Sequence, residues 1–258
     1  MTTYTQLAVD NFQRANENPI NPAHWTTGTG FVALAVVSNL CESPDSITFA
    51  KDAFAYYSGA SFPADQYGEI TLYNVAATSF VYVVCRTNAL ATGYSASISG
   101  PLGNPAGQID LICENTQVTL GTWIGTLNVG DVVRVECVGT AISIKLNGTV
   151  IISATDANAV SGSVGVNLSP FGVIGDAVIS LFAGGSISSV YSVPDDRNFS
   201  VFPNLPVNVQ GTLTYTAEAH PSVTPPVDSR AEGAPVDSRK AENIPENSRA
   251  PGVFGPNE

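Results

Sequence analysis

The chain has 258 residues, of which 44% are hydrophobic and only 12% are charged. This length can bury one substantial core and exceeds that of a minimal module, so we expect one large domain with an appendage. The 22 acidic residues outnumber the 10 basic residues, and the formal net charge is −12 at pH 7. Because nucleic-acid-binding proteins need a basic surface to displace counterions from phosphates, this balance excludes nucleic acid as a direct ligand.

Sequence features of zinc enzymes, exported proteins and membrane proteins are missing. His24 and His220 are far apart, and no HExxH or CxxC spacing occurs. The N-terminal residues MTTYTQLAVDNFQRAN lack the basic and apolar regions of a secretory signal, and no apolar run reaches 18 residues. We therefore expect no transition-metal catalysis, no export signal and no membrane insertion.

The predicted strands begin after Thr27. Up to Phe182, short β-branched and aromatic runs alternate with Gly, Asn, Pro and Asp at intervals of about 8–12 residues, which is typical of an antiparallel β-sandwich or barrel. The predicted strands are 68–74, 79–87, 94–100, 108–115, 131–139, 141–153, 161–169 and 177–185.

Two tight turns and one polar ladder are predicted within these strands. Val138-Gly139-Thr140 joins two strands as a hairpin, and Asn147-Gly148 is typical of a type I′ turn. On this hairpin Arg134, Glu136 and Lys145 alternate with apolar residues, so we expect them to form a solvated cross-strand ladder.

All four cysteines lie inside apolar β-like runs. Because a free cysteine packs as a small hydrophobic residue, we expect buried, reduced thiols, with one or two disulfides as the alternative. The residues concerned are Cys41, Cys85, Cys113 and Cys137.

The composition changes after Gly185. Residues 186–217 are predicted to be a connector with one short strand, GTLTYTAEA, and residues 218–258 a proline-rich extended arm that has too few apolar residues to fold alone. The arm contains a pentapeptide repeat at Pro226–Arg230, Pro235–Arg239 and Pro245–Arg249.

Six short motifs within residues 8–185 resemble those of concanavalin A-like (LamG-like) jelly-roll domains of bacterial and phage proteins. They are Asp10-x-Phe12-x-Arg14 with Trp25, Asp65-Gln-Tyr67-x-Glu69, a strand ending at Arg86 with Tyr94 on the next, Gly130-Asp131-x-x-Arg134 before Asn147-Gly148, Ser161–Gly165, and Asp176 through Phe182. The resemblance implies an all-β antiparallel sandwich over residues 1–185. The closing SRAPGVFGPNE resembles the endings of tailed-phage structural proteins.

The resemblance includes glycosidases with a Glu-x-Asp-x-x-Glu strand, whose two glutamates serve as nucleophile and acid/base. This chain has no such triplet and no Gly-x-Ser-x-Gly nucleophile elbow. We therefore expect a protein that is not an enzyme, with glycoside hydrolysis as the least favoured alternative.

Strand alternation gives candidates for carbohydrate binding. Aromatic faces stack on pyranose rings, and charged groups bond to sugar hydroxyls. Alternation places Ile70, Leu72, Val81 and Val83 on one face of their strands and the polar and aromatic residues between them on the other. The candidates, expected on one sheet face, are Tyr67, Glu69, Tyr82, Arg86 and Tyr94. The alternative is structural: Glu69 pairs with Arg86, and the tyrosines fill the groove.

Two aspartates are candidates for Ca²⁺. Asp10 and Asp176 would lie on the first and last strands, which neighbour each other in the domains that the chain resembles. Calcium needs six to eight oxygens, so backbone carbonyls and water would have to contribute. The alternative is turn capping or an ion pair with Arg14.

The repeated arm predicts docking onto neighbouring subunits. Identical segments at near-constant spacing suit multivalent binding, and each arginine can reach a carboxylate in bidentate geometry. The predicted contact residues are Arg230, Arg239, Arg249, Asp228 and Asp237. A disordered solubilising tail is the alternative.

Taken together, these features predict a non-enzymatic structural protein of a virion. It would be a homo-oligomeric capsid decoration protein, head fibre or tail-associated subunit, assembled in the host cytoplasm and released with the particle. The arm would bind other virion subunits, and the lectin-like domain would bind surface glycans. The alternative is a free carbohydrate-binding module or bacterial adhesin.

Overall fold

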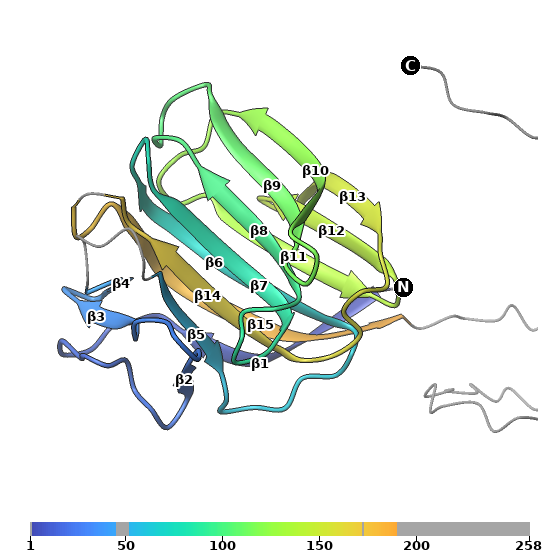
Figure 1. Cartoon of the computed structure of the whole chain (residues 1–258), viewed down its shortest axis with the longest axis horizontal. Helices are drawn as coiled ribbons and strands as arrows, with labels where there is room; N and C mark the ends of the chain where they lie inside the picture. Colours follow the sequence, from blue (N-terminus) through green and yellow to red (C-terminus); the bar gives the residue numbers. More distant parts are fainter. Residues whose placement is uncertain (1, 45–51, 172, 190–258) are drawn as a thin grey trace, which may run out of the picture. The chain divides into compact units, whose positions relative to one another are not determined.

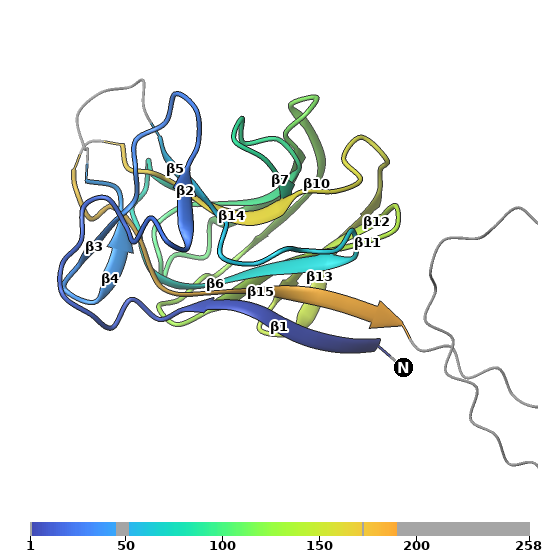
Figure 2. The same cartoon turned by 90° about the horizontal axis from the view of Figure 1, so that it is seen from below.

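In a computed structural model of the chain, the described residues are 2–44, 52–171 and 173–189. Their regular structure is entirely β, and two antiparallel sheets pack face to face (Figures 1 and 2). Within these residues no helix is long and apolar enough to cross a membrane. The predicted all-β antiparallel sandwich is confirmed.

Sheet 1 has eight strands, and its last strand in the sequence, β15, lies between β6 on one side and both β4 and β1 on the other. In spatial order the strands are β13 (Thr149–Thr155), β12 (Ala141–Leu146), β11 (Val132–Val138), β6 (Gln66–Val75), β15 (Ala177–Ser189), β4 (Leu40–Glu42) and β3 (Ala35–Val37), with β1 (Thr2–Asp10) beside the C-terminal part of β15.

Sheet 2 has seven strands and covers the other side of the core. In spatial order they are β10 (Val118–Gly125), β9 (Gly107–Cys113), β8 (Tyr94–Ser99), β7 (Phe80–Thr87), β14 (Ser163–Ser169), β5 (Ala53–Tyr57) and β2 (Trp25–Thr27).

The core lies between the sheets and follows the predicted alternation. Ile70 and Leu72 of β6 and Val81 and Val83 of β7 are fully buried, whereas the residues between them face outward or are covered from outside. Trp25 packs edge-on against Phe182, with ring centroids 4.7 Å apart. Burying these side chains is the main stabilisation of the sandwich.

The predicted turns are confirmed. Val138 and Ala141 end and begin β11 and β12, and the two strands pair directly on either side of the turn. Asn147 and Gly148 have φ values of 50° and 82°, as a type I′ turn requires.

The four cysteines are all buried and free. Desolvation raises the pKa of the Cys41 and Cys85 thiols, which keeps them protonated. The prediction of buried, reduced thiols is confirmed over the disulfide alternative.

The last strand is longer than predicted. β15 continues from Ala177 to Ser189, and Thr2 of β1 pairs with Ser189 (Figure 2). The predicted connector beyond this point and the whole repeat arm lie outside the described residues, including Arg230, Arg239, Arg249, Asp228 and Asp237.

Candidate functional site

The five predicted sugar-binding side chains do not meet on one surface. β6, which carries Tyr67 and Glu69, belongs to sheet 1, whereas β7 and β8, which carry Tyr82, Arg86 and Tyr94, belong to sheet 2. Because β6 and β7 pack face to face across the core, their outward side chains point in opposite directions. The expectation of one shared face was therefore wrong.

Tyr67 and Glu69 belong to an ion network on the outer face of sheet 1. Arg134 on the neighbouring strand donates from Nε to Glu69 Oε2 at 2.7 Å, and its Nη2 lies 2.6 Å from the same oxygen. Its guanidinium also lies 4.5 Å from the centre of the Tyr67 ring. Glu69 thus pairs with Arg134, and the alternative that paired it with Arg86 was also wrong.

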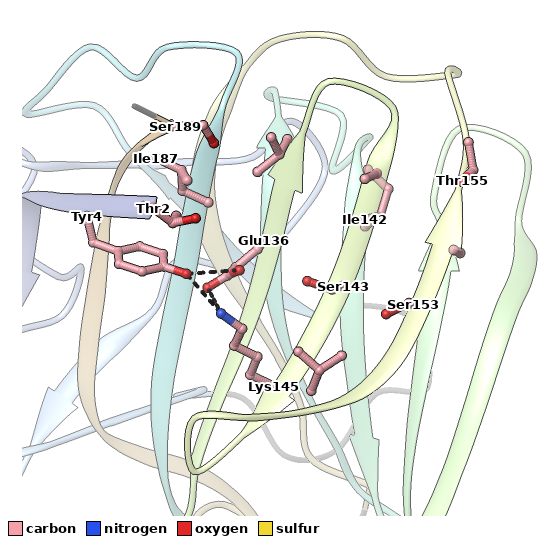
Figure 3. A pocket seen from close by; sticks show the side chains of 14 residues that line it. Thr2, Tyr4, Glu136, Ile142, Ser143, Lys145, Ser153, Thr155, Ile187 and Ser189 are labelled. Carbon is pink, nitrogen blue, oxygen red and sulfur yellow. Dashed lines mark hydrogen bonds and ion pairs between the residues drawn. The ribbon is translucent and has the colours of Figure 1, made fainter. Parts of the chain in front are cut away.

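The same face has a groove of about 540 Å³, whose centre is formed by Tyr4, Glu136 and Lys145 (Figure 3). Lys145 Nζ donates to Glu136 Oε1 and to Tyr4 Oη, both at 2.9 Å. Burial lowers the pKa of Lys145, but these two bonds outweigh it and the pKa is raised. The predicted ladder of Arg134, Glu136 and Lys145 is therefore present, but it is largely buried, whereas we expected it to be solvated.

Arg86 is a buried structural residue at one end of the sandwich. It is 3% exposed, and it donates to the carbonyl oxygens of Ala64 at 2.8 Å and Ala159 at 3.0 Å. The nearest carboxylate, Asp65, is 3.7 Å away. The guanidinium joins two loops and leaves no free face for a sugar.

Tyr94 is also buried, because it pairs with Cys85 and Cys113 in a row that faces the core. Its hydroxyl donates to Asp156 Oδ1 at 2.6 Å. Desolvation, reinforced by this hydrogen bond, raises the pKa of Tyr94 to about 12.

Tyr82 is the predicted candidate that lies on the outer face of sheet 2. The strand register places one residue from each of five adjacent strands in a row with it: Asn167, Tyr82, Ser97, Asp110 and Thr122. Phe80, two residues before Tyr82, is 37% exposed and stacks on its ring at 6.2 Å with an interplanar angle of 28°. The result is an aromatic platform bordered by hydrogen-bonding groups.

Carboxylates surround this platform. Asp110 accepts from Gln108 Nε2 at 2.6 Å and from Thr122 Oγ1 at 2.5 Å, and Asp52 accepts from Ser169 Oγ at 2.7 Å. Desolvation raises the pKa of Tyr82, a hydrogen bond to Ser97 opposes this, and the nearby carboxylates raise it further.

None of the basic residues in the described part of the chain lies in this row. Three pair with carboxylates on other surfaces and one is buried; they are Arg14, Arg134, Lys145 and Arg86. The described part of this face is therefore acidic.

These carboxylates are not spaced as a glycosidase pair. Asp52 bonds to β14, and Asp110 lies on β9, three strands away, which corresponds to about 14 Å at the usual strand spacing. Glycosidases hold their two carboxyl groups about 5–9.5 Å apart.

The predicted calcium ligands are separated. Asp10 pairs with Phe182, six residues along β15 from Asp176, which corresponds to about 20 Å. Asp10 instead bonds to Arg14 and accepts from Trp25 Nε1 at 3.0 Å. The two aspartates therefore do not share a site, and Asp10 follows the ion-pair alternative. The described residues hold no group of three His, Cys, Asp or Glu that would suit a metal ion.

The row around Tyr82 contains residues that sequence reasoning missed. Ser97, Asp110 and Asn167 lie on strands whose alternation was recognised. Their polar positions, in Ser-Ala-Ser-Ile-Ser and Gln-Ile-Asp, were the available signal. The sequence does not give the order of the strands in the sheet, and only that order shows which of these positions are neighbours.

Comparison with known proteins bears on the fold. No protein-family model matches the chain, and no curated protein matches it. The exoplasmic/lumenal domain of VIP36, in a form bound to Ca²⁺ and Man3GlcNAc, is 11% identical at a TM-score of 0.50, covering 74% of this chain and 94% of that one.

Two further solved structures are similar at lower scores. The carbohydrate-binding module CBM66 from Bacillus subtilis is 19% identical with a TM-score of 0.46, covering 64% of this chain and 96% of its own. The endo-β-1,3-glucanase from Pyrococcus furiosus is 13% identical with a TM-score of 0.49, covering 72% and 95%. The similarity to the VIP36 domain agrees with the antiparallel jelly-roll sandwich described above, and the two structures with lower scores carry no further conclusion.

Proposed function

We propose that the domain binds carbohydrate, without cleaving it, on the outer face of sheet 2. The observation that carries this proposal is the stacked pair of Phe80 and Tyr82, set in a row of polar side chains that spans five strands. The row lies on a rigid sheet, so the side chains are positioned before a ligand arrives.

The chemistry of the row suits a sugar. An aromatic platform stacks on the apolar face of a pyranose, and the carboxylates and hydroxyls beside it bond to sugar hydroxyls. Asp110 accepts two hydrogen bonds within the protein, and a carboxylate has about four acceptor positions, so it retains capacity for a ligand. Among the described residues the face carries carboxylates and no lysine or arginine, and this balance favours neutral glycans over acidic ones.

The proposal of binding without cleavage rests on the carboxylate spacing. Asp52 and Asp110 are too far apart to act on the same glycosidic bond. Asp110 and Glu114 are four residues apart along one edge of the face, which corresponds to about 13 Å.

A glycan array followed by titration with the best ligand tests the proposal. Tyr82→Ala should weaken binding up to about tenfold, because an aromatic stacking contact contributes roughly 0.5–1.5 kcal/mol. Tyr73→Ala is the matched control, since Tyr73 is 47% exposed on sheet 1 and outside the row. Equal affinity of the Tyr82 variant and the wild type would refute the proposed site.

A second proposal concerns the whole chain. We propose that it is a structural subunit of a phage particle, displaying the sugar-binding domain and attached to neighbouring subunits by its C-terminal arm. The threefold repeat at Pro226–Arg230, Pro235–Arg239 and Pro245–Arg249 supports this, because repeated short segments give avidity without strong single contacts.

Truncation tests the role of the arm. Particles assembled with a chain that ends after residue 216 should contain much less of this protein than particles with the full chain, as measured by mass spectrometry of purified virions. Full occupancy by the truncated chain would refute the arm proposal and leave the sugar-binding proposal untouched.

A further inference from the structure

The groove on sheet 1 is built from two strand pairs that lie on either side of β6 and β11. Thr2, Tyr4 and Ile187 come from β1 and β15 on one side, and Ser143 and Ser153 come from β12 and β13 on the other (Figure 3). Its volume of about 540 Å³ lies within the range of small-ligand sites.

We propose that this groove is a second saccharide site, specific for neutral sugars. It goes beyond the proposed function, because it shares no residue with the row around Tyr82 and opens on the opposite sheet. The inference depends on three features of the groove: its free hydroxyls, its apolar surface and its balanced charge.

Hydroxyl groups line both walls. Ser143 and Ser153 face each other in the β12–β13 register, Thr155 lies two residues further along β13, and Thr2 stands on the opposite wall. Within the described residues these four hydroxyls have no hydrogen-bond partner, whereas Tyr4, Glu136 and Lys145 do. Each hydroxyl is both a donor and an acceptor, which matches the hydroxyls of a sugar.

Apolar side chains lie between the hydroxyls. Val138, Ala141 and Val150 contribute to the lining, and Val150 is 50% exposed. This alternation of hydroxyl and apolar groups complements a pyranose, which has apolar C–H faces and a polar rim.

The charges in the groove cancel. Glu136 and Lys145 form an ion pair, and Arg134 and Glu69 form another beside it. Glu136 is 6% exposed, so its ion pair with Lys145 is buried. A charged ligand that paired with one of these two residues would leave the other buried without a partner, which is unfavourable. Lys145 has three N–H donors and uses two of them on Tyr4 and Glu136, so the third remains for a neutral acceptor.

Two sites on opposite sheets would let one chain hold two glycan strands. The sites point away from each other across the core, so one short oligosaccharide cannot occupy both. A monomer could then cross-link a polysaccharide.

Methyl NMR of the full chain provides a direct test, with neutral glucose, galactose and mannose tetrasaccharides and a glucuronic acid tetrasaccharide as probes. At least one neutral probe should shift the methyl signals of Val138, Ala141 and Val150 in a saturable way, and the acidic probe should not. Because the groove is independent of Tyr82, the same shifts should persist in Tyr82→Ala.

Ser153→Trp should fill the groove and weaken these shifts at least tenfold in apparent affinity. Thr149→Trp is the matched control, since it places the same bulk on β13 outside the groove. The inference is overturned if no neutral probe shifts the groove methyls, if the acidic probe binds there as well as the neutral ones, or if Ser153→Trp binds like the control. Loss of binding at the Tyr82 face alone would refute the proposed function and leave this site standing.

Discussion

Tyr94 shows how a buried polar residue links stability to pH. Burial, together with the hydrogen bond that its phenol donates to Asp156, raises the pKa of Tyr94 to about 12, above the unfolded value of about 10. A raised tyrosine pKa stabilises the fold fully below pH 10, and this stabilisation is lost as the pH rises through 12.

We therefore expect the free energy of unfolding of the wild type to fall more steeply between pH 10 and 12 than that of Tyr94→Phe. At pH 7 the variant should be less stable by about 1–3 kcal/mol, because Asp156 loses one of its donors and the buried Ala159 N–H loses its acceptor. The hydrogen bond also lowers the pKa of Asp156, so the wild-type advantage should shrink again as the pH falls below about 4. Urea titrations across this range measure both effects, and parallel pH profiles of the two proteins would contradict the assignment.

Arg86 tests the structural role assigned to a residue that the sequence suggested for sugar binding. Arg86→Met should cost about 3–5 kcal/mol in urea unfolding, because the buried carbonyls of Ala64 and Ala159 lose a charged donor. Arg86→Lys should recover little, since one ammonium group cannot reproduce the planar fork. A stable Arg86→Met protein with weakened glycan binding would restore Arg86 to the binding site.

At the scale of single residues, the sequence predicted which side chains are buried better than it predicted which side chains lie next to each other. The alternation of Ile70, Leu72, Val81 and Val83 correctly indicated which side chains face the core. It could not show that Tyr67 and Tyr82 point away from each other, because alternation specifies a face of a strand and not the sheet to which the strand belongs.

At the scale of elements, β1 to β5 and β10 were not among the predicted strands, and β10 and β5 show physical reasons for this. β10 contains Gly121 and Gly125, and glycine weakens a strand pattern. Here the glycines permit close packing, since a Cβ on Gly121 would meet Ile152 at 2.6 Å and one on Gly125 would meet the Trp123 ring at 2.4 Å. β5 is short and almost wholly buried, so it has no alternation to detect.

The β1–β15 contact depends on one such glycine. A Cβ on Gly185 would lie 2.0 Å from the Thr5 carbonyl oxygen, so Gly185→Ala should force the two strands apart. We expect faster hydrogen exchange in β1 and a loss of stability well beyond that of Gly130→Ala. Gly130, unlike Gly185, has a positive φ, of 88°, and it has open space around it, so its substitution should cost about 1 kcal/mol of backbone strain. Equal effects of the two substitutions would contradict this packing.

At the scale of the whole molecule, the sandwich presents two different outer faces. Sheet 1 carries a charge-balanced groove, and sheet 2 carries an acidic aromatic platform. The fold class could be predicted from strand spacing and turn residues. The platform could not, because it depends on which strands are neighbours, and strands that are consecutive in the sequence, such as β6 and β7, belong to different sheets.

The measurement that tests sugar binding on sheet 2 most directly is a set of intermolecular NOEs between the full chain and the best oligosaccharide from the array. The account predicts contacts from the sugar ring protons to the rings of Phe80 and Tyr82, with the oligosaccharide intact after prolonged incubation. Two results would contradict sugar binding on sheet 2 without cleavage. One is an oligosaccharide that is shortened during the incubation, and the other is a bound oligosaccharide with no NOE to the ring of Phe80 or Tyr82.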